Sequence, residues 1–333
     1  MFAEAAEAPA AVAAQLVRNA PVIGTLAASL RAQPPRTVVT IARGSSDNAA
    51  TYARYLCETR LGVLTASAPP SVSSVYGAAL DMADTLVLAL SQSGRSPDLL
   101  AAAEAAARAG GRVVALVNDE TAPLAALAEV TIPLAAGPER SVAATKSFIT
   151  ALSAIAQLVA DWSEDESLRA GLDALPATLD AAWQLDWSAA TPLLAKADHL
   201  YVLGRGPGFA VAQEAALKFK ETCGLHAEAF SAAEVRHGPM ALVGADFPVL
   251  AFLPSDASRA GMDETVAALR AQGATVLTVG GSGGDALPIV ECHPLLLPIA
   301  QTQAVYRMMD ALSAARGHDP DAPPHLAKVT ETL

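Results

Sequence analysis

The sequence predicts an α/β protein with two doubly wound parallel-sheet subdomains that are related by an internal repeat. Three observations support this prediction. Short apolar, β-branched runs alternate with Ala-rich helical segments, which is typical of a parallel sheet covered on both faces. Turns rich in Gly and hydroxyl side chains follow two of the predicted strands. The chain also matches itself at a shift of 162 residues.

The stretch from residue 83 to residue 118 predicts one βαβ unit. It contains a buried strand, a hydroxyl-rich turn, an Ala-rich helix and a second buried strand, at Thr85–Leu90, Ser91–Ser96, Pro97–Ala109 and Arg112–Val117. Ser96 is placed to cap the helix, Pro97 suits its first position, and Asp98 favours the positive end of its dipole. Free backbone amides at that end make the turn a cradle for an anion, most naturally a phosphate. An ordinary polar loop is the alternative.

The composition indicates a globular protein with a large core, since 52% of its 333 residues are hydrophobic and 17% are charged. A net charge of −12 argues against a partner that is nucleic acid or a membrane surface, because both need clustered Lys and Arg. The longest apolar helical run, Phe148–Val159, is shorter than the roughly 20 residues that span a bilayer. Three cysteines without CxxC spacing predict neither disulfides nor zinc, so we expect a reducing cytoplasm.

The remaining elements alternate in the same way along the chain. In the first half we expect strands at Thr37–Ala42, Val63–Ala66 and Glu129–Leu134. We expect N-terminal helices at about Ala3–Ala32, a helix that follows the first strand and runs to about Arg60, and helices at Val72–Leu80, Ala122–Leu127 and Ala144–Trp162. In the second half we expect strands at His199–Leu203, Phe247–Leu253 and Thr275–Val279, and helices at Phe209–Thr222, Arg259–Ala271 and Ile299–Arg316. The predicted domains are an N-terminal helical arm (1–35), a first subdomain (36–162), a helical connector (163–195), a second subdomain (196–318) and a C-terminal tail (319–333).

The repeat aligns the two halves in one register. Ile41–Gly44 falls on Leu203–Gly206, and Gly111, Val114 and Val117 fall on Gly273, Val276 and Val279. The halves are not equivalent, because Ser91-Gln92-Ser93 falls on Leu253-Pro254-Ser255. We therefore expect one site per chain, with its phosphate held by the first half.

The second half carries its own polar residues. Glu214, Lys218 and Glu221 are spaced i, i+4 and i+7 on one face of a helix that stops at Gly224, where a solvated face with surface ion pairs is the alternative. Beyond it, five charged or imidazole side chains crowd an Ala-rich segment: His226, Glu228, Glu234, Arg236 and His237. His226, Glu228 and His237 allow a metal site as an alternative, but HExxH, GxxxxGK[ST] and GxGxxG are missing, so we expect no metal and no organic cofactor. We also expect no nucleophile elbow of a Ser–His–Asp hydrolase. Acid–base and amine chemistry beside a phosphate remains.

Seven motifs carry a family resemblance. They are Arg43-Gly44-Ser45-Ser46, Ser91-Gln92-Ser93-Gly94, Val142-Ala143-Ala144-Thr145-Lys146, Lys218-Phe219-Lys220-Glu221, His226-Ala227-Glu228-Ala229, Arg236-His237-Gly238-Pro239 and His325-Leu326-Ala327-Lys328. Over residues 36–333 the chain resembles the double sugar-isomerase (SIS) domain family. The seven motifs follow one another in the same order as in the isomerase half of glucosamine-6-phosphate synthase. It is also similar to stand-alone glucosamine-6-phosphate deaminases of the SIS type. The resemblance implies two flavodoxin-like subdomains.

The resemblance also implies roles for individual residues. The sugar phosphate would be held by Ser45, Ser46, Ser91, Gln92, Ser93 and Ser96, and the substrate would further contact Gly44, Val142, Ala143 and Ala144. Glu221 would move the proton between C1 and C2, assisted by Lys218. His237 of the partner subunit would open the sugar ring, and Lys328 on the C-terminal tail would close over the site. A homodimer is therefore implied.

Two departures from the family pattern bear on the activity. The Cys-Gly-Thr-Ser loop of the family reads Arg43-Gly44-Ser45-Ser46, and Ala144 replaces a serine, which leaves the sugar specificity open. Phe2 stands where the synthase has its glutaminase cysteine, so we expect no glutamine hydrolysis and no ammonia delivery.

The resemblance then implies conversion of glucosamine 6-phosphate to fructose 6-phosphate and ammonia. A hexose-phosphate isomerase, a galactosamine-6-phosphate deaminase and a fructosamine-phosphate deglycase are alternatives. A non-catalytic sugar-phosphate sensor is an alternative of another class, although residues 1–36 are too short and too acidic for a DNA-binding domain.

Overall fold

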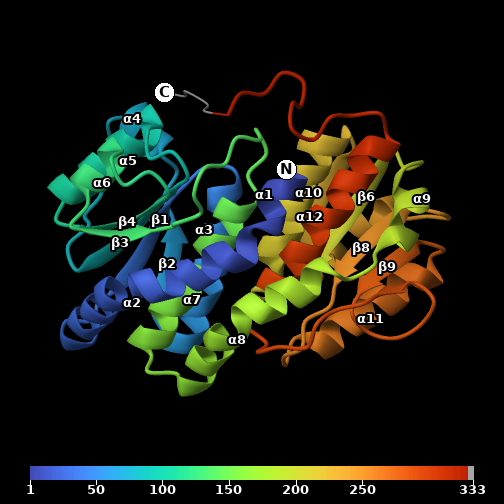
Figure 1. Ribbon diagram of the computed structural model, residues 1–333, viewed down its shortest axis with the longest axis horizontal. Helices are drawn as coiled ribbons and strands as arrows, with labels where there is room; N and C mark the ends of the chain where they lie inside the picture. Colours follow the sequence, from blue (N-terminus) through green and yellow to red (C-terminus); the bar gives the residue numbers. More distant parts are fainter. Residues whose placement is uncertain (329–333) are drawn as a thin grey trace. The chain divides into compact units, whose positions relative to one another are not determined.

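A computed structural model describes residues 1–328 of the chain, which form two compact α/β units (Figure 1). The first-half unit comprises residues 10–139, 146–174 and 327–328, and the second-half unit comprises residues 1–9, 140–145 and 175–326. The last five residues of the predicted C-terminal tail lie outside the described residues. Over residues 1–328, no helix combines the length and the apolar character needed to cross a membrane.

The first-half unit is built on a parallel five-stranded sheet in the order β2-β1-β3-β4-β5. The strands are β1 (Thr37–Ile41), β2 (Leu64–Ser67), β3 (Thr85–Ser91), β4 (Arg112–Val117) and β5 (Val130–Pro133). This order is that of a doubly wound, flavodoxin-like sheet. Thr37 pairs with Thr85 and Ile41 with Ala89, so β1 and β3 end almost together. The loops that follow these two strands therefore lie side by side at the carboxyl edge of the sheet.

Helices cover both faces of this sheet. They are α2 (Ala8–Ala32), α3 (Ser45–Leu56) with a π-helical turn at Cys57–Leu61, α4 (Ser71–Ser74), α5 (Pro97–Arg108), α6 (Pro123–Leu127) and α7 (Lys146–Trp162), followed by α8 (Glu166–Trp183), which enters the second-half unit. Helices α5 and α6 pack on the face that presents Val87, Ala89 and Val113, and α3 packs with α7. Every residue of β3 is buried, as the continuous apolar run predicts.

The second-half unit repeats the topology in the order β10-β9-β8-β6-β7. Its strands are β6 (His199–Gly204), β7 (His226–Ser231), β8 (Pro248–Phe252), β9 (Thr275–Val279) and β10 (Ala286–Leu287). Its helices are α1 (Phe2–Ala6), α9 (Thr191–Leu194), α10 (Gly208–Cys223), α11 (Arg259–Ala271) and α12 (Leu297–Ala315), with short 3-10 turns at Ser188–Ala190, Glu234–His237 and Pro239–Leu242. Helix α11 packs on one face of the sheet, while α10 packs with α12 and α12 with α1 (Figure 1). The predicted fold class and its repeat are confirmed.

The structure differs from the predicted elements in three places. The helix expected at Val72–Leu80 is the single turn α4, because Gly77 takes a φ of +60° and the chain around it is exposed. Strands β7 and β10 were not predicted. β7 lies at the edge of its sheet and has the half-exposed sequence HAEAFS, which offers no continuous apolar run to identify it.

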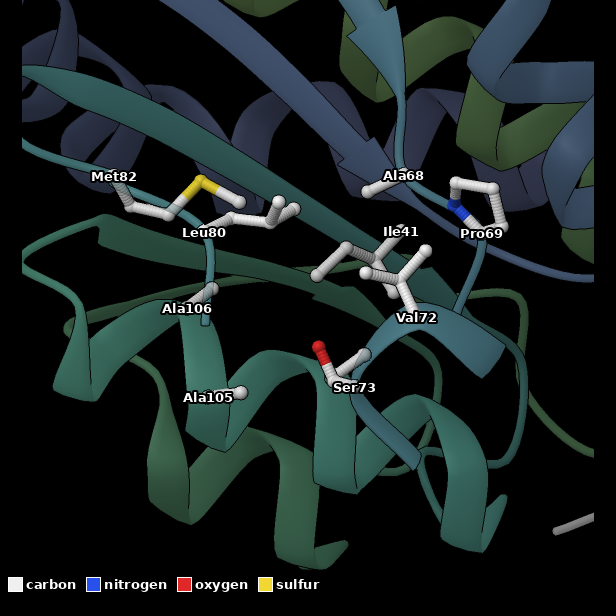
Figure 2. Close-up of a pocket in the computed structure, with 10 residues that line it drawn as sticks. Ile41, Ala68, Pro69, Val72, Ser73, Leu80, Met82, Ala105 and Ala106 are labelled. Carbon is white, nitrogen blue, oxygen red and sulfur yellow. The ribbon is translucent and has the colours of Figure 1, made fainter. Parts of the chain in front are cut away.

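A small cavity lies against the side of the first-half sheet, between α4, α5 and the end of β1 (Figure 2). Its walls are mainly apolar and include Ile41, Val72, Leu80 and Met82. Its volume is about 10 Å³, which is about the space of one water molecule. This cavity is too small to hold a sugar phosphate.

Candidate functional site

Two polar loops meet at the carboxyl edge of the first-half sheet, and we call them the phosphate loops (residues 43–48 after β1 and 91–96 after β3). Gly44 precedes α3 with a φ of +56°, a left-handed conformation that favours glycine. In the second loop the Ser91 hydroxyl accepts a hydrogen bond of 2.9 Å from the Gly94 amide. A Cβ on Gly94 would lie 2.7 Å from the Ala122 side chain, so this turn is tight and requires glycine.

An ion pair joins the half-exposed Arg43 of the first phosphate loop to the buried Asp98 at the start of α5. Arg43 donates from Nε and Nη2 to Oδ2 of Asp98, at 2.9 and 2.8 Å. Asp98 is completely buried in the first turn of α5, where its other oxygen accepts from the Leu99 amide at 2.8 Å. The sequence assigned Asp98 only to the helix dipole and missed this pairing. The available sign of this pairing in the sequence was Arg43, because it stands at a position where the family pattern has cysteine.

The six predicted phosphate-binding residues belong to these two loops. Ser45 and Ser46 are half-buried in the first turn of α3, and Gln92, Ser93 and Ser96 are half-buried after β3, whereas Ser91 is buried. Ser96 does precede α5, but its side chain makes no capping hydrogen bond, so that part of the prediction is wrong. The structure thus brings all six residues to one edge of one unit, where helix N-termini and hydroxyl groups suit an anion.

The equivalent turn of the second-half unit is closed. A Cβ on Gly204 would lie 2.5 Å from the carbonyl oxygen of Gly208, so the end of β6 packs directly against the start of α10. Pro207 precedes that helix in place of a serine. The two halves therefore differ at the very turn where the first one offers hydroxyl groups.

Helix α10 carries a buried charge cluster. The Lys218 ammonium lies 3.3 Å from Glu214 Oε1 and 2.5 Å from Glu221 Oε2. Burial alone would lower the pKa of Lys218, but the two carboxylates outweigh it and raise the pKa above the ordinary value of 10.5. Lys218 is therefore an ammonium ion at neutral pH. Tyr306 of α12 donates to Glu214 Oε1 at 3.0 Å.

The three acidic and basic side chains on this face differ in exposure. Glu214 and Lys218 are 1% exposed, whereas Glu221 is 23% exposed. The alternative of a solvated face with surface ion pairs is therefore wrong. Glu221 is the member of the cluster that solvent can reach, and α10 ends just beyond it at Gly224, in the predicted left-handed conformation. The sequence placed Glu214 on this face but gave it no role; its i, i+4 spacing to Lys218 was the available signal.

His237 is exposed at the end of a 3-10 turn in the second-half unit. It lines an open cavity of about 440 Å³ together with Arg205 and Arg236. In the same unit, Ala143 is buried and Val142 and Ala144 are half-buried. Within residues 1–328 no group of three or more His, Cys, Asp or Glu side chains is arranged to hold a metal ion.

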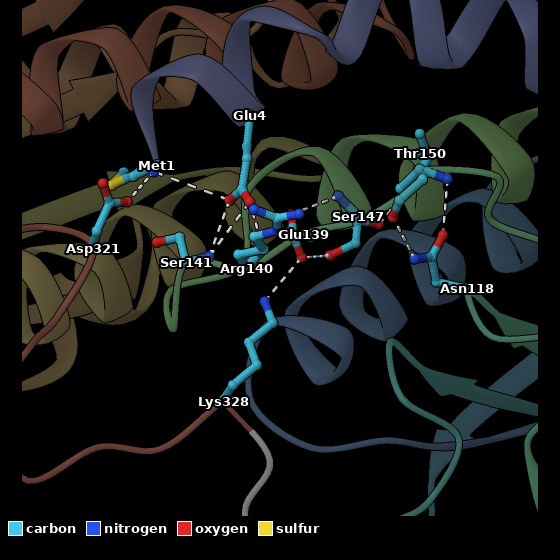
Figure 3. A network of polar contacts seen from close by, with 12 residues as sticks. Met1, Glu4, Asn118, Glu139, Arg140, Ser141, Ser147, Thr150, Asp321 and Lys328 are labelled. Carbon is cyan, nitrogen blue, oxygen red and sulfur yellow. Dashed lines mark hydrogen bonds and ion pairs between the residues drawn. The ribbon is translucent and has the colours of Figure 1, made fainter.

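Lys328 is engaged by a residue that the sequence did not single out (Figure 3). Its Nζ lies 3.2 Å from Oε2 of Glu139 in the first-half unit. Glu139 also accepts hydrogen bonds from the amide and the hydroxyl of Ser147, at 3.1 and 2.6 Å. An acidic residue shortly before a long helix was the signal that could have identified it.

Comparisons with known proteins agree with this fold. A family model described as SIS domain matches residues 33–160 and 193–314. The glutamine–fructose-6-phosphate aminotransferase (isomerizing) of Streptomyces coelicolor is 31% identical over 98% of this chain and 58% of its own length. The chain spans about half the length of the curated relatives it matches, from 43% to 58%.

Solved structures share the whole architecture. A candidate phosphosugar isomerase from Silicibacter pomeroyi is 46% identical, with a TM-score of 0.91 over 96% of this chain and 99% of that one. The glucosamine-6-phosphate deaminase of Thermotoga maritima has a TM-score of 0.74 and 24% identity, covering 97% of this chain and 100% of that one. At that identity the second likeness concerns the fold alone.

Proposed function

The chain belongs to the SIS domain family, and we propose that it is a phosphosugar isomerase and deaminase that converts glucosamine 6-phosphate to fructose 6-phosphate and ammonia. The observation that carries the proposal is the cluster on α10, where the buried Lys218 ammonium holds the accessible carboxylate of Glu221 at 2.5 Å. A carboxylate held by a hydrogen bond from a buried ammonium keeps one position, which is what a general base needs. The relatives support the substrate class, since the Streptomyces protein is described as an isomerizing fructose-6-phosphate aminotransferase.

The proposed reaction uses one proton transfer between neighbouring carbons. His237 of the partner subunit opens the sugar ring by moving a proton from the anomeric hydroxyl to the ring oxygen. Glu221 then takes the proton from C2 and returns it to C1, while the C1 oxygen gains a proton and the nitrogen loses one, which turns the 2-amino aldehyde into a 2-imino sugar with a C1 hydroxyl. Water adds to the imine carbon, and the C–N bond breaks to give the C2 ketone and ammonia. Lys218 stays charged throughout, so its role is to hold Glu221 and to stabilise negative charge rather than to act as a nucleophile.

The remaining parts of the proposal concern binding and context. The phosphate loops hold the 6-phosphate through Ser45, Ser46, Ser91, Gln92, Ser93 and Ser96, and Gly44, Val142, Ala143 and Ala144 contact the sugar. Lys328 acts on the bound sugar from the C-terminal tail. The protein works as a homodimer in the cytoplasm, and the free state of Cys57, Cys223 and Cys292 supports a reducing location.

The test is to incubate the purified protein with glucosamine 6-phosphate and to measure ammonia and fructose 6-phosphate together. We expect equal amounts of both products. Glu221→Gln should abolish turnover and still be protected against heat by the sugar phosphate, because the phosphate loops are intact. Glu104→Gln, the same change at an exposed position of α5, should behave as wild type.

The alternatives make different predictions in the same assay. Interconversion of unaminated hexose phosphates with no ammonia release would favour a simple isomerase. Heat protection without turnover of any sugar phosphate would favour a sensor. Normal turnover in Glu221→Gln would refute the role of Glu221.

A further inference from the structure

Glu139 is a completely buried carboxylate with partners on two separate segments of the chain. It lies seven residues before Lys146, the first residue of α7, and it is 0% exposed. Its Oε1 accepts from the Ser147 amide, and its Oε2 accepts from both the Ser147 hydroxyl and the Lys328 ammonium. A buried carboxylate is costly unless such groups compensate its charge. Glu139 thus binds the start of α7 and the tail at once.

Hydrogen bonds connect the segment of Glu139 to a phosphate loop of the same unit. The backbone N–H of Asn118 donates to the backbone carbonyl of Gln92 at 3.3 Å. The Asn118 side chain accepts from the Ala136 amide at 2.8 Å and donates to the Gly137 carbonyl at 2.9 Å. Asn118 follows β4 and Gln92 follows β3, so all these groups lie at the carboxyl edge of the first-half sheet. Glu139 is therefore fixed at the edge that carries the phosphate loops.

The tail itself has little regular structure to hold it there. Residues 319–328 contain turns and irregular backbone, and the Lys328 side chain is 25% exposed. A long, flexible ammonium side chain loses its position readily unless a charged partner fixes it. The carboxylate of Glu139, by contrast, is held by the amide and the hydroxyl of Ser147 at the start of α7.

We propose that Glu139 is a positioning residue that tethers the tail and sets the place of the Lys328 amine beside the phosphate loops. Its catalytic consequence rests on the proposed function, whereas the tether itself does not. Glu139 has two kinds of partner: Ser147 at the start of α7 and Lys328 on the tail. A variant of each partner therefore tests one of the two contacts separately.

The first measurement follows the tail directly. Leu326 is 47% exposed, and chymotrypsin cleavage after it gives a chain that ends at residue 326, which mass spectrometry detects. Glu139→Gln keeps the shape of the side chain and removes the ion pair, so we expect cleavage about 5–30 times faster than in wild type. Lys328→Met should give the same increase, and the double variant should add nothing to it.

Two matched variants separate the tether from a general loss of structure. Ser147→Ala removes one hydrogen bond at the helix start and leaves the ion pair, so the cleavage rate should not change. Glu104→Gln should also cleave as wild type. An unchanged rate in Glu139→Gln, or effects of Glu139→Gln and Lys328→Met that multiply in the double variant, would overturn the proposal.

Kinetics then test the consequence for the reaction. Glu139→Gln should lower kcat about tenfold and change KM less than about twofold, because it misplaces a reacting group and leaves the phosphate loops intact. In a Lys328→Met background the same change should have no further effect on kcat, which a purely structural role could not produce. If wild type lacks deaminase and isomerase activity but the cleavage pattern holds, the proposed function fails and the tether stands.

Discussion

Replacing Lys218 by Met removes the charge at the centre of the α10 cluster and keeps the length of the side chain. At 3.3 Å and an effective dielectric constant of about 20, the attraction between Lys218 and Glu214 is about 5 kcal/mol. Glu214 is 1% exposed, so the variant leaves its charge buried, with the Tyr306 hydroxyl still donating to it. Glu221 can recover part of its hydration because it is 23% exposed. We expect Lys218→Met to lower the free energy of unfolding by about 3–5 kcal/mol.

Urea denaturation followed by tryptophan fluorescence measures this effect. Adding Glu214→Gln should restore most of the loss, because the amide has no charge that burial penalises. Lys220→Met changes an exposed lysine of the same helix and should shift stability by less than about 0.5 kcal/mol. The reasoning is refuted if Lys218→Met unfolds like Lys220→Met, or if the double variant is no more stable than Lys218→Met.

The pH dependence gives a second check on the same cluster. The pKa of Lys218 is raised in the folded state, so its ion pairs contribute fully below its unfolded value of 10.5 and are lost as the pH rises through the folded value. The stability difference between wild type and the double variant should therefore stay level from pH 7 to about pH 10 and narrow only in stronger alkali.

Three further predictions concern other parts of the molecule. Arg43→Ala leaves the buried Asp98 without its guanidinium, so it should lower stability by about 1–3 kcal/mol and weaken sugar-phosphate binding in calorimetry, whereas Arg108→Ala, at an exposed pair, should do neither. Burial raises the thiol pKa values, to about 12, 11 and 11 for Cys57, Cys223 and Cys292, so Ellman's reagent at pH 8 should label the protein only after unfolding; prompt labelling of the native protein would contradict this. If His237 acts across a homodimer, an equal mixture of inactive Glu221→Gln and His237→Ala subunits should regain about a quarter of wild-type activity after exchange, and none if both residues act within one subunit.

The sequence was informative wherever a local pattern records the structure. The apolar runs of β3 and β4 identified the buried strands, and Gly224 marked the end of α10. The repeat predicted two similar halves, and the structure shows the same strand order in both. The sequence also placed the phosphate-loop residues after β1 and β3, and the pairing of these two strands brings the loop residues together. Edge strand β7 escaped because its half-exposed residues carry no such pattern.

Only the tertiary structure decided which charges are buried and with whom they pair. The spacing of Glu214, Lys218 and Glu221 put them on one helix face, but the packing of α10 with α12 turned part of that face into the interior. Arg43 and Asp98 are 55 residues apart, and Glu139 and Lys328 are 189 residues apart. Local sequence patterns extend over a few turns of a helix or the length of a strand. They therefore do not record pairs between residues that are far apart in the sequence. The oppositely charged side chains meet because the chain folds back on itself. The carboxylate of each pair, Asp98 or Glu139, is completely buried, so the loss of its cationic partner is costly.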